Sequence, residues 1–153
     1  HMGHIPRKYI PKTLSKKDYK KQETNINHTR KLYKKKIYVD RPKVKSFKSK
    51  QSPHVKTAKK LYGIENIVPS KALAKATKCS IKGLRQITKK GRGAYYSSGS
   101  RPNQTAQSWA RARLASTLTG GKASLVDYKI LESECHGKSP ALLLAKKLKK
   151  DKK

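Results

Sequence analysis

The residues best suited to chemistry lie in one Gly-, Ser-, Tyr- and Arg-rich stretch, which runs from Gly91 to Thr105. Glycines let a backbone approach an anion closely, and Arg92 and Arg101 supply planar guanidinium groups suited to phosphate oxygens. Further neutral donors come from the side chains of Ser97, Ser98, Ser100, Asn103 and Gln104. A helix predicted from about Thr105 would direct free N–H groups toward the same stretch. This combination favours binding of a phosphate-sized anion.

Two adjacent tyrosines, Tyr95 and Tyr96, extend this chemistry from phosphates to bases. An aromatic side chain that stacks on an unpaired base contributes about 1–3 kcal/mol. The stretch is not a P-loop, because no Gly-Lys-Ser/Thr follows at the required spacing. Two interpretations stay open: a ligand-binding loop, or a structural loop whose tyrosines pack on the core and whose arginines face water.

The charge of the chain points to a polyanionic partner. Its 153 residues include 40 Lys and Arg against 8 Asp and Glu, a formal net charge of +32. Such a charge repels itself in a compact state, and an anionic polymer relieves that repulsion while releasing counterions. Lysines outnumber arginines, which favours point-charge contacts with phosphates over bidentate base recognition. We therefore expect nucleic-acid binding with little sequence preference, and DNA is favoured over RNA.

Cations beyond the Gly91–Thr105 loop are expected to contribute to this binding. They are Lys34, Lys35, Lys36, Lys82, Arg85, Lys89, Lys90, Arg111 and Arg113. The sequence predicts no catalytic residue, no cofactor and no metal site, because its carboxylates and histidines are scattered. It predicts no transmembrane segment, because it has no run of about 18 apolar residues. Cys79 and Cys135 lack zinc-site spacing and are predicted to be reduced thiols in an intracellular protein or particle. Asp127 is interpreted as a helix-capping residue.

The elements that must position these residues are predicted to be mainly α-helical. Residues 1–2 are interpreted as an expression remnant. Charge and apolar patterning then divide the chain into a Lys-rich segment (3–60), a folded helical centre (61–137) and a basic tail (138–153). In the first segment Ser15 and Asp18 fit a capping box, and residues 37–47 leave a short β-hairpin as an option.

The centre is expected to contain three helical features. Ser70 and Ser80 are suitable caps for two short helices across a tight turn, the second ending at Gly91. This arrangement resembles a helix-turn-helix, although a purely structural helical corner is the favoured interpretation. A further helix is predicted from about Thr105 to Thr119, and Ser124 with Asp127 matches a second capping box.

Residues from Arg7 to about Glu134 resemble an uncharacterised domain of unknown function found in proteins of giant and algal DNA viruses. The resemblance rests on residues 9–15 (YIPKTLS), 44–50 (VKSFKSK), 93–109 (GAYYSSGSRPNQTAQSW), 112–116 (ARLAS) and 119–122 (TGGK). It implies a viral origin, and hence a location inside the virion or at replication sites in the host cytoplasm or nucleus. It implies no activity, fold or site residue.

Three functions follow as hypotheses. The first is a viral nucleic-acid-binding protein that compacts or accompanies the genome. The second is an enzyme acting on nucleic acid or a phosphorylated substrate at the Gly91–Thr105 loop, with Tyr96 or Ser100 as a nucleophile beside Arg101. The third is an internal virion protein that binds other virion proteins, acidic partners or an anionic membrane, the last through the amphipathic stretch Leu142–Leu148.

Overall fold

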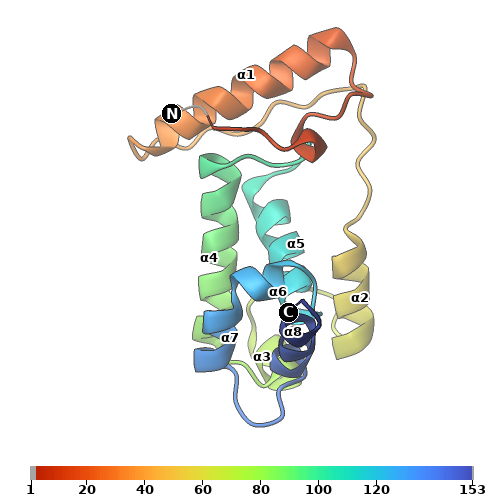
Figure 1. Cartoon of the computed structure of the whole chain (residues 1–153), viewed down its shortest axis with the longest axis vertical. Coiled ribbons are helices and arrows are strands. Elements are labelled where there is room, and N and C mark those ends of the chain that lie inside the picture. The colour runs from red at the N-terminus through yellow and green to blue at the C-terminus, as the bar shows by residue number, and fades with distance from the viewer. Residues whose placement is uncertain (1–2, 153) are drawn as a thin grey trace. The chain divides into compact units, whose positions relative to one another are not determined.

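The computed structural model describes residues 3–152 and consists almost entirely of helices. In chain order they are η1 (Arg7–Tyr9), α1 (Lys16–Tyr33), α2 (Pro53–Tyr62), α3 (Lys71–Thr77), α4 (Ile81–Ser97), α5 (Ala106–Leu118), α6 (Ala123–Val126), α7 (Tyr128–Glu134) and α8 (Pro140–Asp151) (Figure 1). The prediction of a mainly α-helical fold is confirmed. Within the described range the hairpin expected at residues 37–47 does not form, because this segment bonds to side chains of its own unit rather than to itself.

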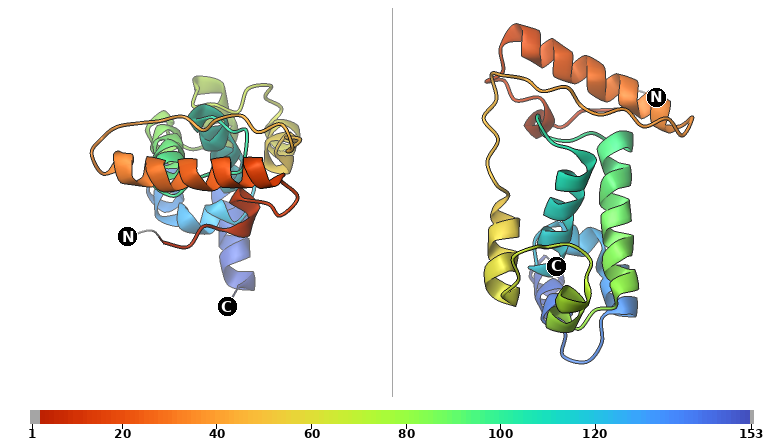
Figure 2. Two further views of the ribbon diagram at one scale, coloured as in Figure 1. Left: turned by 90° about the horizontal axis from the view of Figure 1, so that it is seen from above. Right: turned by 180° about the vertical axis from the view of Figure 1, so that it is seen from behind.

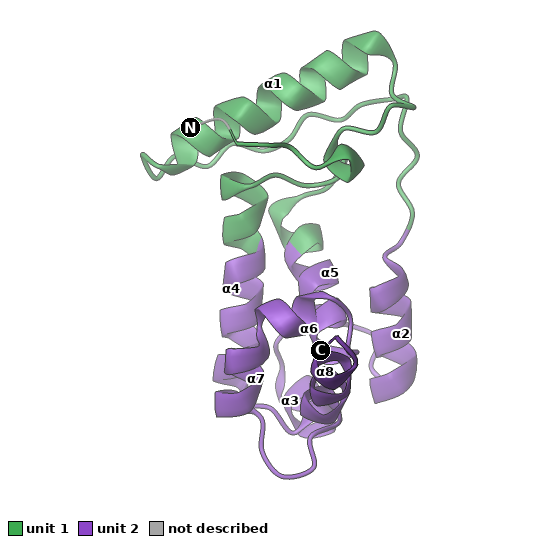
Figure 3. Ribbon diagram, in the orientation of Figure 1, with its two compact units in different colours: residues 1–50, 92–109 green, residues 51–91, 110–153 purple. Residues whose placement is uncertain are grey.

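The chain packs as two compact units that do not follow the divisions predicted from charge. Unit 1 comprises residues 1–50 and 92–109, and unit 2 comprises residues 51–91 and 110–153 (Figure 3). The Lys-rich segment therefore folds together with the predicted loop. The amphipathic stretch of the predicted basic tail forms helix α8 and contributes Ala141, Leu142 and Ala145 to the core of unit 2.

Unit 1 is built around helix α1. Ser15 begins the helix, because its Oγ accepts a 3.2 Å hydrogen bond from the N–H of Asp18, as predicted. Ser46 takes the place of the reciprocal capping-box bond: its Oγ accepts from Ser15 N and donates to Asp18 Oδ2 at 2.6 Å. The segment that follows α1 is thereby fixed to the start of the helix, and it runs back along α1 in both views of Figure 2.

The apolar core of unit 1 is small. Its buried hydrophobic cluster consists of Ile10, Leu14, Ile26 and Val44. Polar groups complete the packing: Gln22 Nε2 donates to the carbonyls of Tyr9 and Ser100 at 3.1 and 3.2 Å. Buried polar side chains of this kind are stable only when hydrogen-bonded, so their partners fix the surrounding loops.

Unit 2 has a much larger apolar core. Its buried members are Val55, Ala58, Ile67, Leu73, Cys79, Leu84, Ile87, Leu114, Ala115, Leu118, Leu131, Cys135, Ala141, Leu142 and Ala145. Helices α3 and α4 begin at the predicted serine caps, since Ser70 Oγ accepts from Leu73 N and Ser80 Oγ accepts from Gly83 N. Cys79 and Cys135 form a disulfide rather than staying reduced, and this bond joins the start of α4 to the end of α7.

Helix α4 continues through Ser97 and does not end at Gly91 as predicted. Gly91 is a packing residue, because a Cβ built there would lie 2.8 Å from the Cα of Ala110 in α5. The glycine was interpreted as a helix terminator, but it allows a close approach of two helix backbones. The first half of the predicted Gly91–Thr105 loop is consequently helical.

Candidate nucleic-acid interface

The densest group of cations in unit 1 lies on one face of α1. Four lysines line an open groove together with the side chains of Thr24, Asn25 and His28 and with Pro42 from the following segment. These lysines are Lys16, Lys17, Lys20 and Lys21. Their spacing of one, three and four residues places them on adjacent rows of a single helical surface. We call this surface the α1 groove.

The opposite face of α1 explains why the groove faces solvent. Gln22, Ile26 and Thr29 are the buried residues of the helix, and they recur at intervals of four and three. Burial of this stripe leaves the lysine rows exposed. Lys16, Lys17, Lys20 and Lys21 are all exposed, so their ammonium groups can reach an anion without moving the backbone.

Pro42 reaches the groove because the residue before it, Arg41, is held in place by several contacts. Arg41 is 7% exposed and lies over the ring of Tyr95, with its guanidinium carbon 4.2 Å from the ring centre. Its guanidinium donates to Ser100 Oγ at 3.0 Å, to Asn25 Oδ1 at 3.0 Å and to the carbonyl of Tyr95. Burial lowers the pKa of Arg41, although its interactions with Tyr95, Tyr96 and Tyr9 compensate part of that effect.

The acidic residue at the start of the groove is occupied by hydrogen bonds. Asp18 Oδ2 accepts from both the backbone N and the Oγ of Ser46, at 2.9 and 2.6 Å. These bonds lower the pKa of the Asp18 carboxyl. The carboxylate is therefore held by Ser46, and Lys21 is the groove lysine whose charge acts on it. Lys16, Lys17 and Lys20 are the groove lysines that remain for an external anion.

The structure separates the predicted loop residues into exposed and structural ones. Arg92, Arg101 and Ser98 are exposed, and Tyr96 is half-buried. Tyr95 and Ser100 are fully buried, which corrects the expectation that they contact a ligand. Their polar groups serve the fold instead: the Tyr95 hydroxyl accepts from Arg41 N at 2.9 Å and donates to the Gln104 carbonyl at 2.9 Å.

Two further predicted contacts are also structural. Asn103 has φ = 63°, and its side chain accepts from Val44 N at 2.7 Å and donates to the carbonyls of Val44 and Phe47. Gln104 Oε1 accepts from Ser108 Oγ at 2.6 Å at the start of α5. The donor group of Asn103 is committed to the fold of unit 1, which corrects its assignment as a ligand donor, whereas the Gln104 side chain is engaged through its oxygen.

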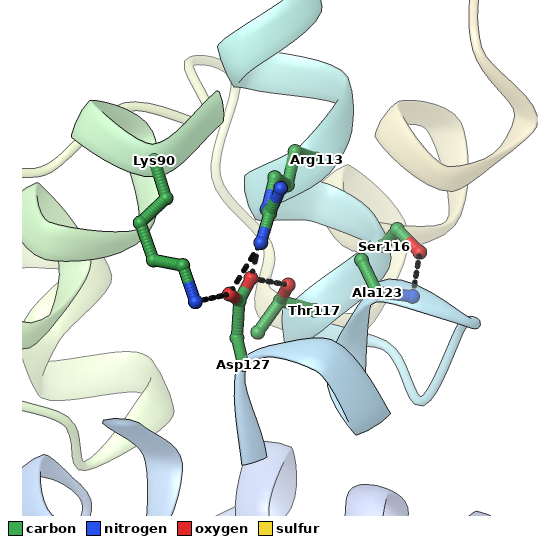
Figure 4. A network of polar contacts seen from close by, with 6 residues as sticks. All are labelled: Lys90, Arg113, Ser116, Thr117, Ala123 and Asp127. Carbon is green, nitrogen blue, oxygen red and sulfur yellow. Dashed lines mark hydrogen bonds and ion pairs between the residues drawn. The ribbon is translucent and has the colours of Figure 1, made fainter. Parts of the chain in front are cut away.

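The predicted cations outside the loop also divide into exposed and structural groups. Lys34, Lys35 and Lys36 of unit 1 are exposed, as are Lys82, Arg85, Lys89 and Arg111 of unit 2. Arg113 and Lys90 instead bind Asp127, with Arg113 Nη2 2.7 Å and Lys90 Nζ 3.2 Å from its Oδ1 (Figure 4). Arg113 is therefore a structural residue, and Lys90 forms an ion pair with the buried carboxylate of Asp127.

Asp127 was interpreted as a helix cap, but its side chain makes no capping bond. Its carboxylate is buried and also accepts from Thr117 Oγ1 at 2.8 Å. Burial acts to raise the pKa of Asp127, but the bonds from Arg113 and Thr117 outweigh it and lower that pKa. The matched sequence pattern at Ser124 is explained otherwise, since Ser124 Oγ donates to the Gly121 carbonyl.

Sequence reasoning assigned phosphate contacts to the Lys-rich segment as a whole without singling out the lysines of the α1 groove, and it missed Arg41. The groove had a usable signal, because lysines at 16, 17, 20 and 21 follow the helical period. Arg41 had none: an arginine between Asp40 and Pro42 resembles any exposed loop cation. Only the fold of unit 1 brings Asn25, Tyr95 and Ser100 around it.

The residues proposed for nucleophilic catalysis are held in unreactive environments. Ser100 Oγ is buried and donates to the Arg101 carbonyl at 2.9 Å. Burial, followed by the charge of Asp40, raises the pKa of the Tyr96 hydroxyl, whereas an activated nucleophile needs a lowered one. Residues 3–152 contain no cluster of His, Cys, Asp and Glu suited to a metal ion.

Comparison with known proteins gives one match. The model of a family described as a family of unknown function, DUF5824, matches residues 6–131. No curated protein and no solved structure matches the chain. Among the described residues no helix combines the length and apolar character that crossing a membrane requires.

Proposed function

The chain belongs to this family of unknown function, and from its surface we propose that it binds the phosphate backbone of nucleic acid with little sequence preference. The α1 groove carries the proposal. Four exposed lysines lie on one helical face, and the neighbouring carboxylate of Asp18 is bound by Ser46. Phosphates spaced along a polymer match such a row of cations.

The distribution of ion pairs supports the same conclusion. Within residues 3–152 the ion pairs of the structure both involve Asp127, with Lys90 and Arg113 as partners. Most of the 40 Lys and Arg side chains thus have no internal carboxylate to neutralise them. An external polyanion gains binding free energy from them without first breaking internal pairs.

The resemblance to viral proteins refines the proposal. The polyanion would be the viral genome, with DNA favoured over RNA, and the protein would accompany or compact it in the virion or at replication sites. The third hypothesis has less support, since Ala141, Leu142 and Ala145 of α8 are buried in unit 2 and not available to a lipid surface.

The test is a titration of random-sequence duplex DNA at several salt concentrations between about 50 and 200 mM. The variant Lys16→Gln/Lys17→Gln/Lys20→Gln removes three charges from the groove. The matched control, Lys146→Gln/Lys147→Gln/Lys150→Gln, removes three exposed charges from α8. If each groove lysine contacts one phosphate, the plot of log K against log salt becomes less steep in the groove variant, and the magnitude of its slope decreases by about 3.

Two results would contradict the proposal at different levels. Equal losses in both triple variants would show that total charge, and not the α1 groove, determines affinity. Absence of binding to any nucleic acid at about 50 mM salt would reject nucleic-acid binding altogether.

A further inference from the structure

Unit 1 carries a row of tyrosine rings beside its exposed lysines. The rings of Tyr33 and Tyr38 are 5.9 Å apart, and those of Tyr38 and Tyr96 are 5.2 Å apart. Tyr38 is 60% exposed, although it has a ring on either side. Tyr33 and Tyr96 are half-buried and hold it in place. More than half of the Tyr38 side chain is thus accessible to solvent while two neighbouring rings support it.

The backbone around Tyr38 is fixed by the end of α1. Ile37 N donates to the Leu32 carbonyl at 3.0 Å and Lys36 N to the Tyr33 carbonyl at 2.9 Å, the bonding pattern of a Schellman motif. This motif requires a left-handed residue, and Lys36 adopts it with φ = 61°. Glycine is preferred at such a position, so a lysine adopts this backbone conformation at a conformational cost.

Cations lie next to the rings. Lys34, Lys35 and Lys36 are all exposed and separate Tyr33 from Tyr38 in the chain. On α4, Arg92 is exposed and precedes Tyr96 by four residues, which places both side chains on one face of the helix. Gly93 allows α4 to lie close, because a Cβ built there would be 3.3 Å from the Tyr33 hydroxyl.

One carboxylate limits where a phosphate can bind. At the Tyr96 end of the row, the charge of Asp40 acts together with burial to raise the pKa of the Tyr96 hydroxyl, so a carboxylate lies close to that ring. A nucleic-acid backbone is therefore directed to the end formed by Tyr33 and Lys34–Lys36. The bases then extend toward Tyr38.

We propose that Tyr38, supported by Tyr33 and Tyr96 and flanked by Lys34–Lys36, is a stacking platform for unpaired bases of single-stranded nucleic acid. This inference rests on the proposed function and names the form of nucleic acid that unit 1 takes. Duplex bases are stacked on one another and present no free face, whereas every unpaired base does. The lysines meet the backbone of the same strand.

The experiment compares Tyr38→Ala with a matched control, Tyr19→Ala, in the full chain. Tyr19 is the exposed tyrosine on α1 outside the row, 38% exposed. Binding is measured with fluorescein-labelled oligothymidylate, with oligouridylate and with a duplex. We expect Tyr38→Ala to weaken single-strand binding about 5- to 100-fold while leaving duplex binding within about twofold. Tyr38→Trp retains the ring and is expected to retain or strengthen single-strand binding.

A second measurement is independent of affinity: a 5-iodouracil oligonucleotide, when irradiated, should crosslink to the peptide containing Tyr38. If the wild type binds duplex, and if wild type, Tyr38→Ala and Tyr19→Ala bind single strands with equal affinity, the platform is overturned. The proposed function then still stands. Loss of duplex and single-strand binding to the same extent in Tyr38→Ala also overturns it. Failure of the wild type to bind either form removes both proposals. Comparison of the thymidylate and uridylate arms assigns DNA or RNA.

Discussion

The two units carry similar charge, but each is stabilised internally by different interactions. Unit 1 has 19 Lys and Arg against 3 Asp and Glu, and unit 2 has 21 against 5, so each has a formal excess of +16. Unit 2 encloses an extensive apolar core and a disulfide. Unit 1 buries four hydrophobic residues in its cluster and relies on Arg41, Gln22, Tyr95 and Asn103 for the rest.

This difference separates a stabilising region from the region that we propose binds nucleic acid. Apolar burial in unit 2 contributes free energy that does not depend on an external partner. In unit 1 the polar network specifies where the loops lie but contributes less net free energy, because hydrogen bonds to water are exchanged for internal ones. The exposed cations and the tyrosine row of unit 1 then lie on a frame whose geometry is defined by a few polar anchors.

The largest expected effect is in the core of unit 2. Leu114 is fully buried in α5, and Leu114→Ala should lower the free energy of unfolding by about 3 kcal/mol, because the cavity is not refilled. Urea denaturation followed by circular dichroism measures this change. The matched control Leu143→Ala, at a site 51% exposed, should cost much less. Equal losses would show that apolar burial does not dominate unit 2.

A smaller loss is expected at the polar anchor of unit 1. Arg41→Ala should cost about 2 kcal/mol, because Asn25 Oδ1, Ser100 Oγ and the Tyr95 carbonyl lose a donor while the burial penalty of the charge disappears. Hydrogen exchange read by mass spectrometry should show faster exchange in residues 25–50 and little change in unit 2. The matched control is Arg101→Ala, which removes an exposed arginine from the same unit. Unchanged exchange in Arg41→Ala would remove Arg41 from its anchoring role.

The sequence predicts local structure better than long-range contacts in this protein. Ser15, Ser70 and Ser80 were identified as helix caps because a cap depends on residues three positions apart. The role of Gly91 was missed because it depends on Ala110 in another helix. The sequence left open which of Tyr95 and Tyr96 points inward, because the burial of Tyr95 depends on Arg41, 54 residues earlier in the chain.

The same distinction applies to the candidate site. Lysines of the α1 groove follow a helical period and were within reach of sequence reasoning, as the exposed Lys34–Lys36 were. The row of tyrosines was not, because it joins the end of α1 to α4 through Tyr38. The disulfide was likewise hidden, since Cys79 and Cys135 are 56 residues apart and nothing local indicates their pairing.

The smallest expected effect concerns the one buried carboxylate described in unit 2, and it depends on pH. Asp127→Asn removes the charge bound by Arg113 and Lys90 and should cost about 1–2 kcal/mol at neutral pH. The pKa of Asp127 is lowered in the folded state, so this stability is present above the ordinary value of 3.8 and is lost as pH falls below it. The difference between wild type and variant in urea denaturation should therefore be constant from about pH 5 to 7 and shrink toward pH 2. Asp151→Asn, at an exposed position of α8, is the control for the change in net charge. A difference that persists unchanged at pH 2 would mean that Asp127 acts through packing and not through its charge.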